Sequence, residues 1–153
     1  MTLNQIIARI QGIAEAHDQI NTFFFGDVDE FLATDNAYPA CFMGIPSESG
    51  VKQETDLSCS LYFLDRMIQG GSEDDKTYNE VEIMCDMREV ALDIFAQIRY
   101  QKFDPKWNID TSFSIEYFNE KDEDYLAGVK LNITIKLPYN ADRCQVPTTY
   151  NYD

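Results

Sequence analysis

Four carboxylates recur at helical spacing near the middle of the chain. Glu82, Asp86, Glu89 and Asp93 follow one another at steps of four, three and four residues, so a helix would place them on one face. Each like-charge pair at such a spacing costs roughly 0.2–0.5 kcal/mol, and Arg88 is the cation near enough in sequence to offset them. The face is either ordinary solvated surface, or a surface that meets a negative molecule or a basic partner.

A single histidine, His17, limits the enzyme mechanisms open to this chain. Zinc sites of the His-Glu-x-x-His type and paired-histidine hydrolases need at least two. His17 continues the apolar stripe of the first predicted helix through Ile13, and the helix dipole favours a histidine near a helix C-terminus, so we interpret it as structural. Neither common glycine-rich phosphate motif is present. We therefore predict no enzyme, no catalytic residue, no metal and no cofactor.

The cysteines and the net charge bear on the compartment and the partners. Cys41, Cys59, Cys85 and Cys144 form no Cys-x-x-Cys pair, and the first residues lack the zones of a signal peptide. We expect four free thiols in a reducing cytoplasm. The 12 basic and 27 acidic residues give a net charge of −15, which argues against gripping DNA phosphates or an anionic membrane.

These residues need elements to position them, and the sequence predicts six. A first helix follows a Thr2 cap, and the longest helix carries the four carboxylates. The stretch Tyr38 to Ile45, with a proline at its start, predicts a first strand. Alternation of apolar and polar residues predicts three more, the last with Val129, Leu131, Ile133, Ile135 and Leu137 on its core face. The expected ranges are helices at 3–19 and 77–100 and strands at 38–45, 57–63, 113–117 and 129–137. The order helix-hairpin-helix-hairpin predicts an α+β fold with a mostly antiparallel four-stranded sheet and two helices on one face.

The length of 153 residues and the 44% apolar content suit one domain of ordinary size. We predict a single α+β domain over residues 1–137 and an extended C-terminal arm over residues 138–153. The arm has little amphipathic pattern, so we expect it to lie against a neighbouring subunit. Its candidate contact residues are Pro138, Tyr139, Arg143, Tyr150 and Tyr152.

The order of elements and a few short stretches resemble a viral family. The stretches are Phe25-Gly26-Asp27 to Tyr38-Pro39-Ala40, together with a closing hairpin that has Asp124 to Gly128 at its tip. With the two helices and the hairpin of long strands, they resemble the tail terminator and tail completion proteins of tailed bacteriophages. The chain is also similar to head-to-tail ring proteins, or neck proteins, of phages that infect Bacteroidetes.

The resemblance implies a non-enzymatic virion structural protein that forms a homo-oligomeric ring at the phage neck or tail end. It implies adjacent portal, connector or tail proteins as partners, no membrane, and DNA that passes the lumen without specific binding. It also implies a location in the virion, and in the host cytoplasm during assembly. An acidic lumen would repel the duplex and lower the friction of its passage.

Two readings from other classes remain. An acidic protein of this size could mimic DNA and inhibit a DNA-binding protein, in which case its carboxylates would be spaced like phosphates along one surface. An enzyme with paired carboxylates, such as a glycosidase, would need two acids that flank a concave pocket. Native mass separates the ring from the mimic, and a dependence on divalent metal or a raised carboxyl pKa would favour the enzyme.

Overall fold

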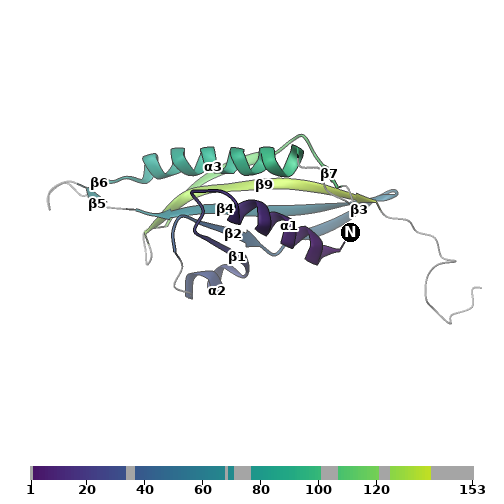
Figure 1. The fold of residues 1–153 in the computed structure, drawn as a ribbon, viewed down its shortest axis with the longest axis horizontal. Helices are drawn as coiled ribbons and strands as arrows, with labels where there is room; N and C mark the ends of the chain where they lie inside the picture. Colours follow the sequence, from purple (N-terminus) through teal and green to yellow (C-terminus); the bar gives the residue numbers. More distant parts are fainter. Residues whose placement is uncertain are drawn as a thin grey trace, which may run out of the picture.

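The chain folds into a long sheet that carries helices on both of its faces (Figure 1). The computed structural model describes residues 2–33, 37–67, 69–70, 77–100, 107–120 and 125–138. The helices are α1 (Leu3–Glu15), α2 (Val28–Ala33) and α3 (Glu80–Tyr100). The strands are β1 (Thr22–Gly26), β2 (Ala40–Gly44), β3 (Ser47–Val51), β4 (Glu54–Arg66), β5 (Gln69–Gly70), β6 (Thr77–Tyr78), β7 (Asn108–Ile109), β8 (Ser114–Glu120) and β9 (Leu126–Pro138).

Two long antiparallel strands form the centre of the sheet. β4 and β9 have 13 residues each and pair over their whole length, from Glu54 opposite Pro138 to Arg66 opposite Leu126. The outer edge of β4 pairs with β2 and β3 in succession, and the outer edge of β9 pairs with β8 and β7. β1 lies beyond β2 and runs parallel to it, which gives the order β1-β2-β4-β9-β7 with β3 and β8 beside this path.

The predicted four-stranded antiparallel sheet with two helices is wrong. The α+β fold has a mixed sheet of seven strands, and α2 is a third helix. β1 was not predicted because it packs on both faces of the sheet, so its residues Phe23, Phe24 and Phe25 are all apolar and show no alternation. The predicted strands also leave out β3, whose residues from Ser47 to Gly50 are exposed and therefore carry no apolar signal.

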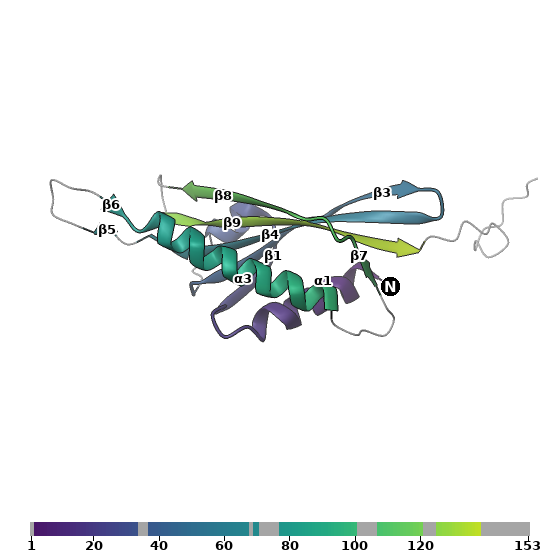
Figure 2. The same ribbon diagram turned by 90° about the horizontal axis from the view of Figure 1, so that it is seen from above.

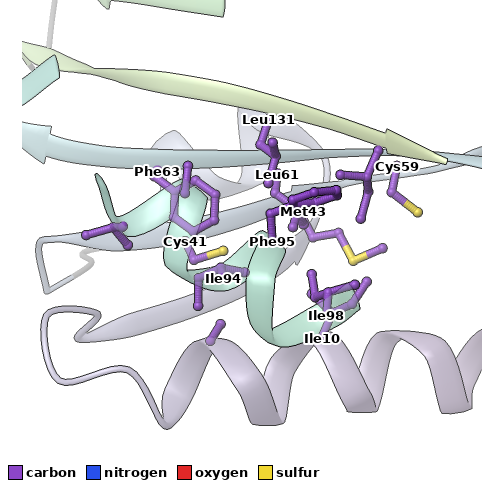
Figure 3. Packing of buried hydrophobic residues seen from close by; sticks show 14 of the residues in the cluster. Ile10, Cys41, Met43, Cys59, Leu61, Phe63, Ile94, Phe95, Ile98 and Leu131 are labelled. Carbon is purple, nitrogen blue, oxygen red and sulfur yellow. The ribbon is translucent and has the colours of Figure 1, made fainter. Parts of the chain in front are cut away.

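The main core lies between the sheet and the pair α1 and α3, which lie alongside each other in Figure 2. Ile6, Ile10 and Ala14 of α1 and seven residues of α3 are buried there: Ile83, Met87, Val90, Ala91, Ile94, Phe95 and Ile98. Figure 3 shows Ile98 next to Ile10 and Ile94 next to Cys41, on the helix side of the inward residues of β2, β4 and β9. The predicted inward register of β9 is confirmed, because Val129, Leu131, Ile133 and Ile135 are buried in this core and Leu137 packs against it.

A smaller aromatic core occupies one end of the opposite face. Phe31 of α2 is buried and stacks on Phe42 of β2, with ring centroids 5.0 Å apart. Phe24 of β1 contacts both rings, with centroid distances of 5.8 Å and 5.9 Å, and Ala40, Leu64 and Leu126 complete the buried set. Phe24 therefore packs under α2 whereas Phe23 and Phe25, on the same strand, pack against the main core.

The helix boundaries differ slightly from the prediction. The Thr2 cap is confirmed, since its hydroxyl accepts a hydrogen bond from the Gln5 amide and the Gln5 side chain accepts one from the Thr2 amide. α1 ends at Glu15 rather than near residue 19. α3 begins at Glu80 rather than residue 77, because Thr77 and Tyr78 pair with β5 in a separate two-stranded ribbon. No helix in the described part of the chain is long and apolar enough to cross a membrane.

Most of the predicted C-terminal arm falls outside the described residues. Pro138 is the last residue of β9 and is exposed. Tyr139, Arg143, Tyr150 and Tyr152, the other candidate contact residues, lie in the part that the structure does not describe. The prediction that the arm contacts a neighbouring subunit therefore stays a prediction.

Candidate functional site: the acidic face of α3

Helix α3 places the four predicted carboxylates on its outer side. Its buried side chains recur at three and four residue steps and pack against β4 and β9, which turns the intervening positions toward solvent. Glu82, Asp86, Glu89 and Asp93 are all exposed, and we call this set the acidic stripe. At 1.5 Å per residue it runs for about 16 Å along the helix.

The two halves of the stripe have different neighbours. Arg88 lies beside Glu89, with a guanidinium nitrogen 2.9 Å from a carboxylate oxygen. Both side chains of that pair are largely exposed, at 46% and 68%, so the pair contributes at most about 1 kcal/mol and leaves the surrounding field negative. Glu80, which opens the helix, accepts a hydrogen bond of 2.8 Å from the amide of Asn119 on β8.

The C-terminal end of the stripe contacts the single histidine. His17 follows α1, and its Nε2 lies 3.1 Å from Oδ2 of Asp93. The backbone amide of Gln19 donates to Nδ1 of the same ring, so in neutral His17 the proton sits on Nε2 and is donated to Asp93. His17 therefore ties the end of α1 to α3. This contact agrees with the structural role interpreted from the sequence and adds a partner, Asp93, that the sequence did not indicate.

A fifth carboxylate, which sequence reasoning missed, extends the acidic surface onto the sheet. Asp65 of β4 has its pKa raised, chiefly because burial disfavours the charged form and also because the negative charge of Asp86 repels it. A hydrogen bond from the Arg66 amide to its carboxylate, 2.8 Å long, works in the opposite direction. A signal was available, because Asp65 continues the alternation of the inward residues Leu61 and Phe63 and so had to face α3.

The acidic stripe and Asp65 form a surface of exposed or partly exposed carboxylates. Among the described residues no polar or charged side chain is buried, and no group of three or more His, Cys, Asp or Glu is arranged to hold a metal ion. A groove of about 480 Å³ lies between α1 and α3 and includes His17, Arg9 and Gln97 on its walls. Arg9 lies over the ring of Trp107, 5.5 Å from its centroid, so this cation already has an aromatic contact.

The opposite face of the sheet carries a second polar surface over its centre. Ser60 donates to the Asn132 carbonyl oxygen at 2.9 Å, and the Asn132 amide nitrogen lies 3.0 Å from both the Ser114 hydroxyl and a Glu116 oxygen. Lys130 is 3.7 Å from Glu116. These groups satisfy one another, so the shallow hollow of about 340 Å³ beside them has no polar atom left buried and unpaired.

The structure describes three of the four cysteines, and all three are free thiols. Cys41 and Cys59 are buried free thiols in the main core, and burial raises the pKa of both. Cys85 is an exposed free thiol on α3, and Cys144 lies outside the described residues. Comparison with known proteins adds no assignment: no protein-family model matches the sequence, and no curated protein matches it.

Proposed function

We propose that this chain is a non-enzymatic virion structural protein that forms a homo-oligomeric ring at the neck or tail end of a tailed bacteriophage. The observation that supports this best is the acidic stripe, four exposed carboxylates on one rigid helix with Asp65 beside them. In the proposed ring this surface lines the channel through which DNA passes, or docks a basic segment of an adjacent portal, connector or tail protein. The sequence resemblance to tail terminator and neck proteins supports the same function.

The electrostatics favour passage of DNA without binding. Lysine and arginine side chains hold DNA by releasing the counterions of its phosphates, and each such contact would slow a moving duplex. A ring repeats the acidic stripe in every subunit, so the duplex meets negative charge around its whole circumference. At physiological salt the field of the wall decays over about 8 Å, which limits the effect to DNA close to the surface.

The isolated subunit supplies the first test. A variant with Glu82→Gln and Asp86→Asn removes two charges from the acidic stripe without touching the contacts of Arg88 or His17. We expect its stability to stay within about 0.5 kcal/mol of the parent protein, because the relief of repulsion between the two side chains and with Asp65 opposes the loss of the favourable interaction of Glu82 with the N-terminus of α3. The matched control removes two acidic charges at the far end of β4, by Glu54→Gln with Asp56→Asn.

The assembled particle supplies the second test. Native mass and electron microscopy of the purified parent protein should show a ring. If the stripe lines the channel, particles that carry the stripe variant should assemble and then deliver DNA more slowly. If the stripe docks a basic segment of an adjacent protein, that docking should be weakened in a way that depends on ionic strength. Particles that carry the control variant should behave as the parent. Normal delivery at every salt concentration would make the stripe ordinary solvated surface. A monomer or dimer that inhibits a DNA-binding protein would instead support the DNA mimic.

A further inference from the structure

The outer edge of the sheet at β1 is unusually well suited to pair with another strand. β1 is the terminal strand on its side of the described sheet, and its five residues pair with β2 alone. In a parallel pair, alternate residues direct both their N–H and C=O groups away from the partner strand. β1 therefore presents a row of backbone donors and acceptors along an edge that no other described strand covers.

The side chains of β1 also favour the addition of a strand at this edge. Its sequence, Thr-Phe-Phe-Phe-Gly, contains three consecutive phenylalanines and no charge, and every one of its residues is only partly buried. Phe23 and Phe25 pack against the main core, and Phe24 packs against the aromatic core on the opposite face. A strand added outside β1 would cover the exposed parts of these rings on both faces of the sheet.

Two other edge strands, β3 and β8, carry charged residues that β1 lacks. Natural sheets protect exposed edges with charged residues, proline or bulges. β8, on the far side of the sheet, contains Glu116 and Glu120, and β3 contains Glu48. β1 has no charge, no proline and no positive-φ residue before its terminal Gly26, so the edge is open to pairing.

We propose that residues 148–152 of a second copy of this chain add as a strand to the outer edge of β1. This inference rests on the self-association in the proposed function but does not depend on a phage neck. Residues 144–152 read Cys-Gln-Val-Pro-Thr-Thr-Tyr-Asn-Tyr and contain no charge, in a protein whose net charge is −15. Their last five, Thr-Thr-Tyr-Asn-Tyr, match the length of β1 and are rich in strand-forming residues.

The geometry of the sheet argues for a second copy as donor. The ladders place Gly26 level with Asn132, so Pro138 lies about 20 Å farther along β9. From β9 to a strand outside β1 is four strand spacings, about 19 Å, and the straight distance is about 28 Å. The ten residue steps from Pro138 to residue 148 of the same chain span at most about 33–36 Å when fully extended. Ten flexible residues have a root-mean-square span of about 17 Å, well short of this distance. The chain's own arm would thus have to be almost fully extended, which lowers its effective concentration at the β1 edge, whereas a neighbouring copy has no such limit.

The test measures exchange of the β1 backbone amides in the full-length protein. The donor variant carries Thr149→Pro with Asn151→Pro, which removes two amide donors from the proposed strand. The control variant carries Ala141→Pro, which places a proline in the same arm but outside residues 144–152. Hydrogen exchange of the peptide that covers residues 22–26 and the native mass are followed over a range of protein concentration.

We expect the outward amides of β1 to exchange about tenfold or more slowly in concentrated than in dilute parent protein, and in the control variant as well. In the donor variant this protection should be lost at every concentration, and the native mass should fall with it. Protection that is lost in the donor variant but does not depend on concentration would assign the strand to the same chain. A ring that persists in the donor variant with β1 still protected would overturn the inference and leave the proposed ring intact. A closed dimer in which the β1 amides are protected would support the inference and contradict the proposed ring.

Discussion

Gly128 of β9 lies directly against the backbone of β4, and its replacement by alanine gives a sharp test of the sheet. A Cβ at this position would lie 1.9 Å from the carbonyl oxygen of Phe63 and 3.2 Å from Cα of Leu64. Real Cβ atoms essentially never come within 3.0 Å of another atom, and backbone cannot swing aside as a flexible side chain can. Gly128→Ala therefore forces β9 away from β4 by roughly 1 Å.

The cost follows from the backbone hydrogen bonds that this movement breaks. Gly128 pairs with Leu64 on one side and Phe118 on the other, and it is buried. A movement of roughly 1 Å lengthens an N···O distance from about 2.9 Å to about 3.9 Å, which is no longer a hydrogen bond. Two buried backbone groups left unpaired, at about 1–3 kcal/mol each, predict a loss of about 2–6 kcal/mol in the free energy of unfolding.

Equilibrium unfolding in urea, followed by far-ultraviolet circular dichroism, measures this loss. Two other glycines serve as controls, because an added Cβ at Gly12 or Gly50 meets no atom within 4 Å. Gly12→Ala should stabilise the protein by about 0.5–1 kcal/mol through helix propensity, and Gly50→Ala in β3 should change it little. If Gly128→Ala unfolds within about 0.5 kcal/mol of the parent protein, with an unchanged m value, the pairing of β4 with β9 is wrong at this point.

Three further experiments test other parts of the structure. Ile133→Ala should cost about 2–5 kcal/mol through the cavity it leaves, and Thr134→Ala on the opposite face less than about 0.5 kcal/mol, both by urea unfolding; equal losses would contradict the register of β9. The raised pKa of Asp65 means that its ionised form lowers stability at neutral pH. Asp65→Asn should therefore raise the melting temperature at pH 7, and the gain should vanish below the ordinary carboxyl pKa of 3.8; an equal gain at pH 3 would contradict this cause. Burial raises the pKa of Cys59 to about 12, so peptide mapping after alkylation of native protein should find Cys85 modified and Cys59 intact.

The parts of the fold that sequence could predict are those whose residues face two different environments. α3 separates a buried stripe from a charged one, and β9 alternates from Val129 to Leu137 between core and polar residues, so a single period identifies each. β1 and β3 give no such contrast. β1 is apolar throughout because it packs on both faces, and β3 is polar because its side chains from Ser47 to Gly50 are exposed. Both strands depend on long-range pairing that local propensity does not record.

The acidic face was predictable for the same reason, but its surroundings were not. The spacing of Glu82 and Asp86 on one helix is a local property, and both are exposed as expected. The contact of Asp93 with His17 joins residues 76 positions apart, and the repulsion between Asp86 and Asp65 depends on how α3 crosses β4. Such contacts exist only after the sheet and helices have packed, so no spacing rule within one element can reveal them.

The acidic stripe and the β1 edge should respond to salt in opposite directions, which allows their roles to be separated in one titration. Copies of a protein with net charge −15 repel one another, and salt screens that repulsion while leaving backbone pairing at the uncharged β1 edge largely unaffected. Association through β1 should therefore strengthen as salt rises. A basic partner held by the carboxylates of α3 should instead be released, because the same screening weakens attraction between opposite charges. A protein that self-associates more strongly at high salt while losing a basic partner uses the two surfaces independently. A joint loss of both associations would mean that copies are held together by charge, and would place the contact between subunits on α3 rather than on β1.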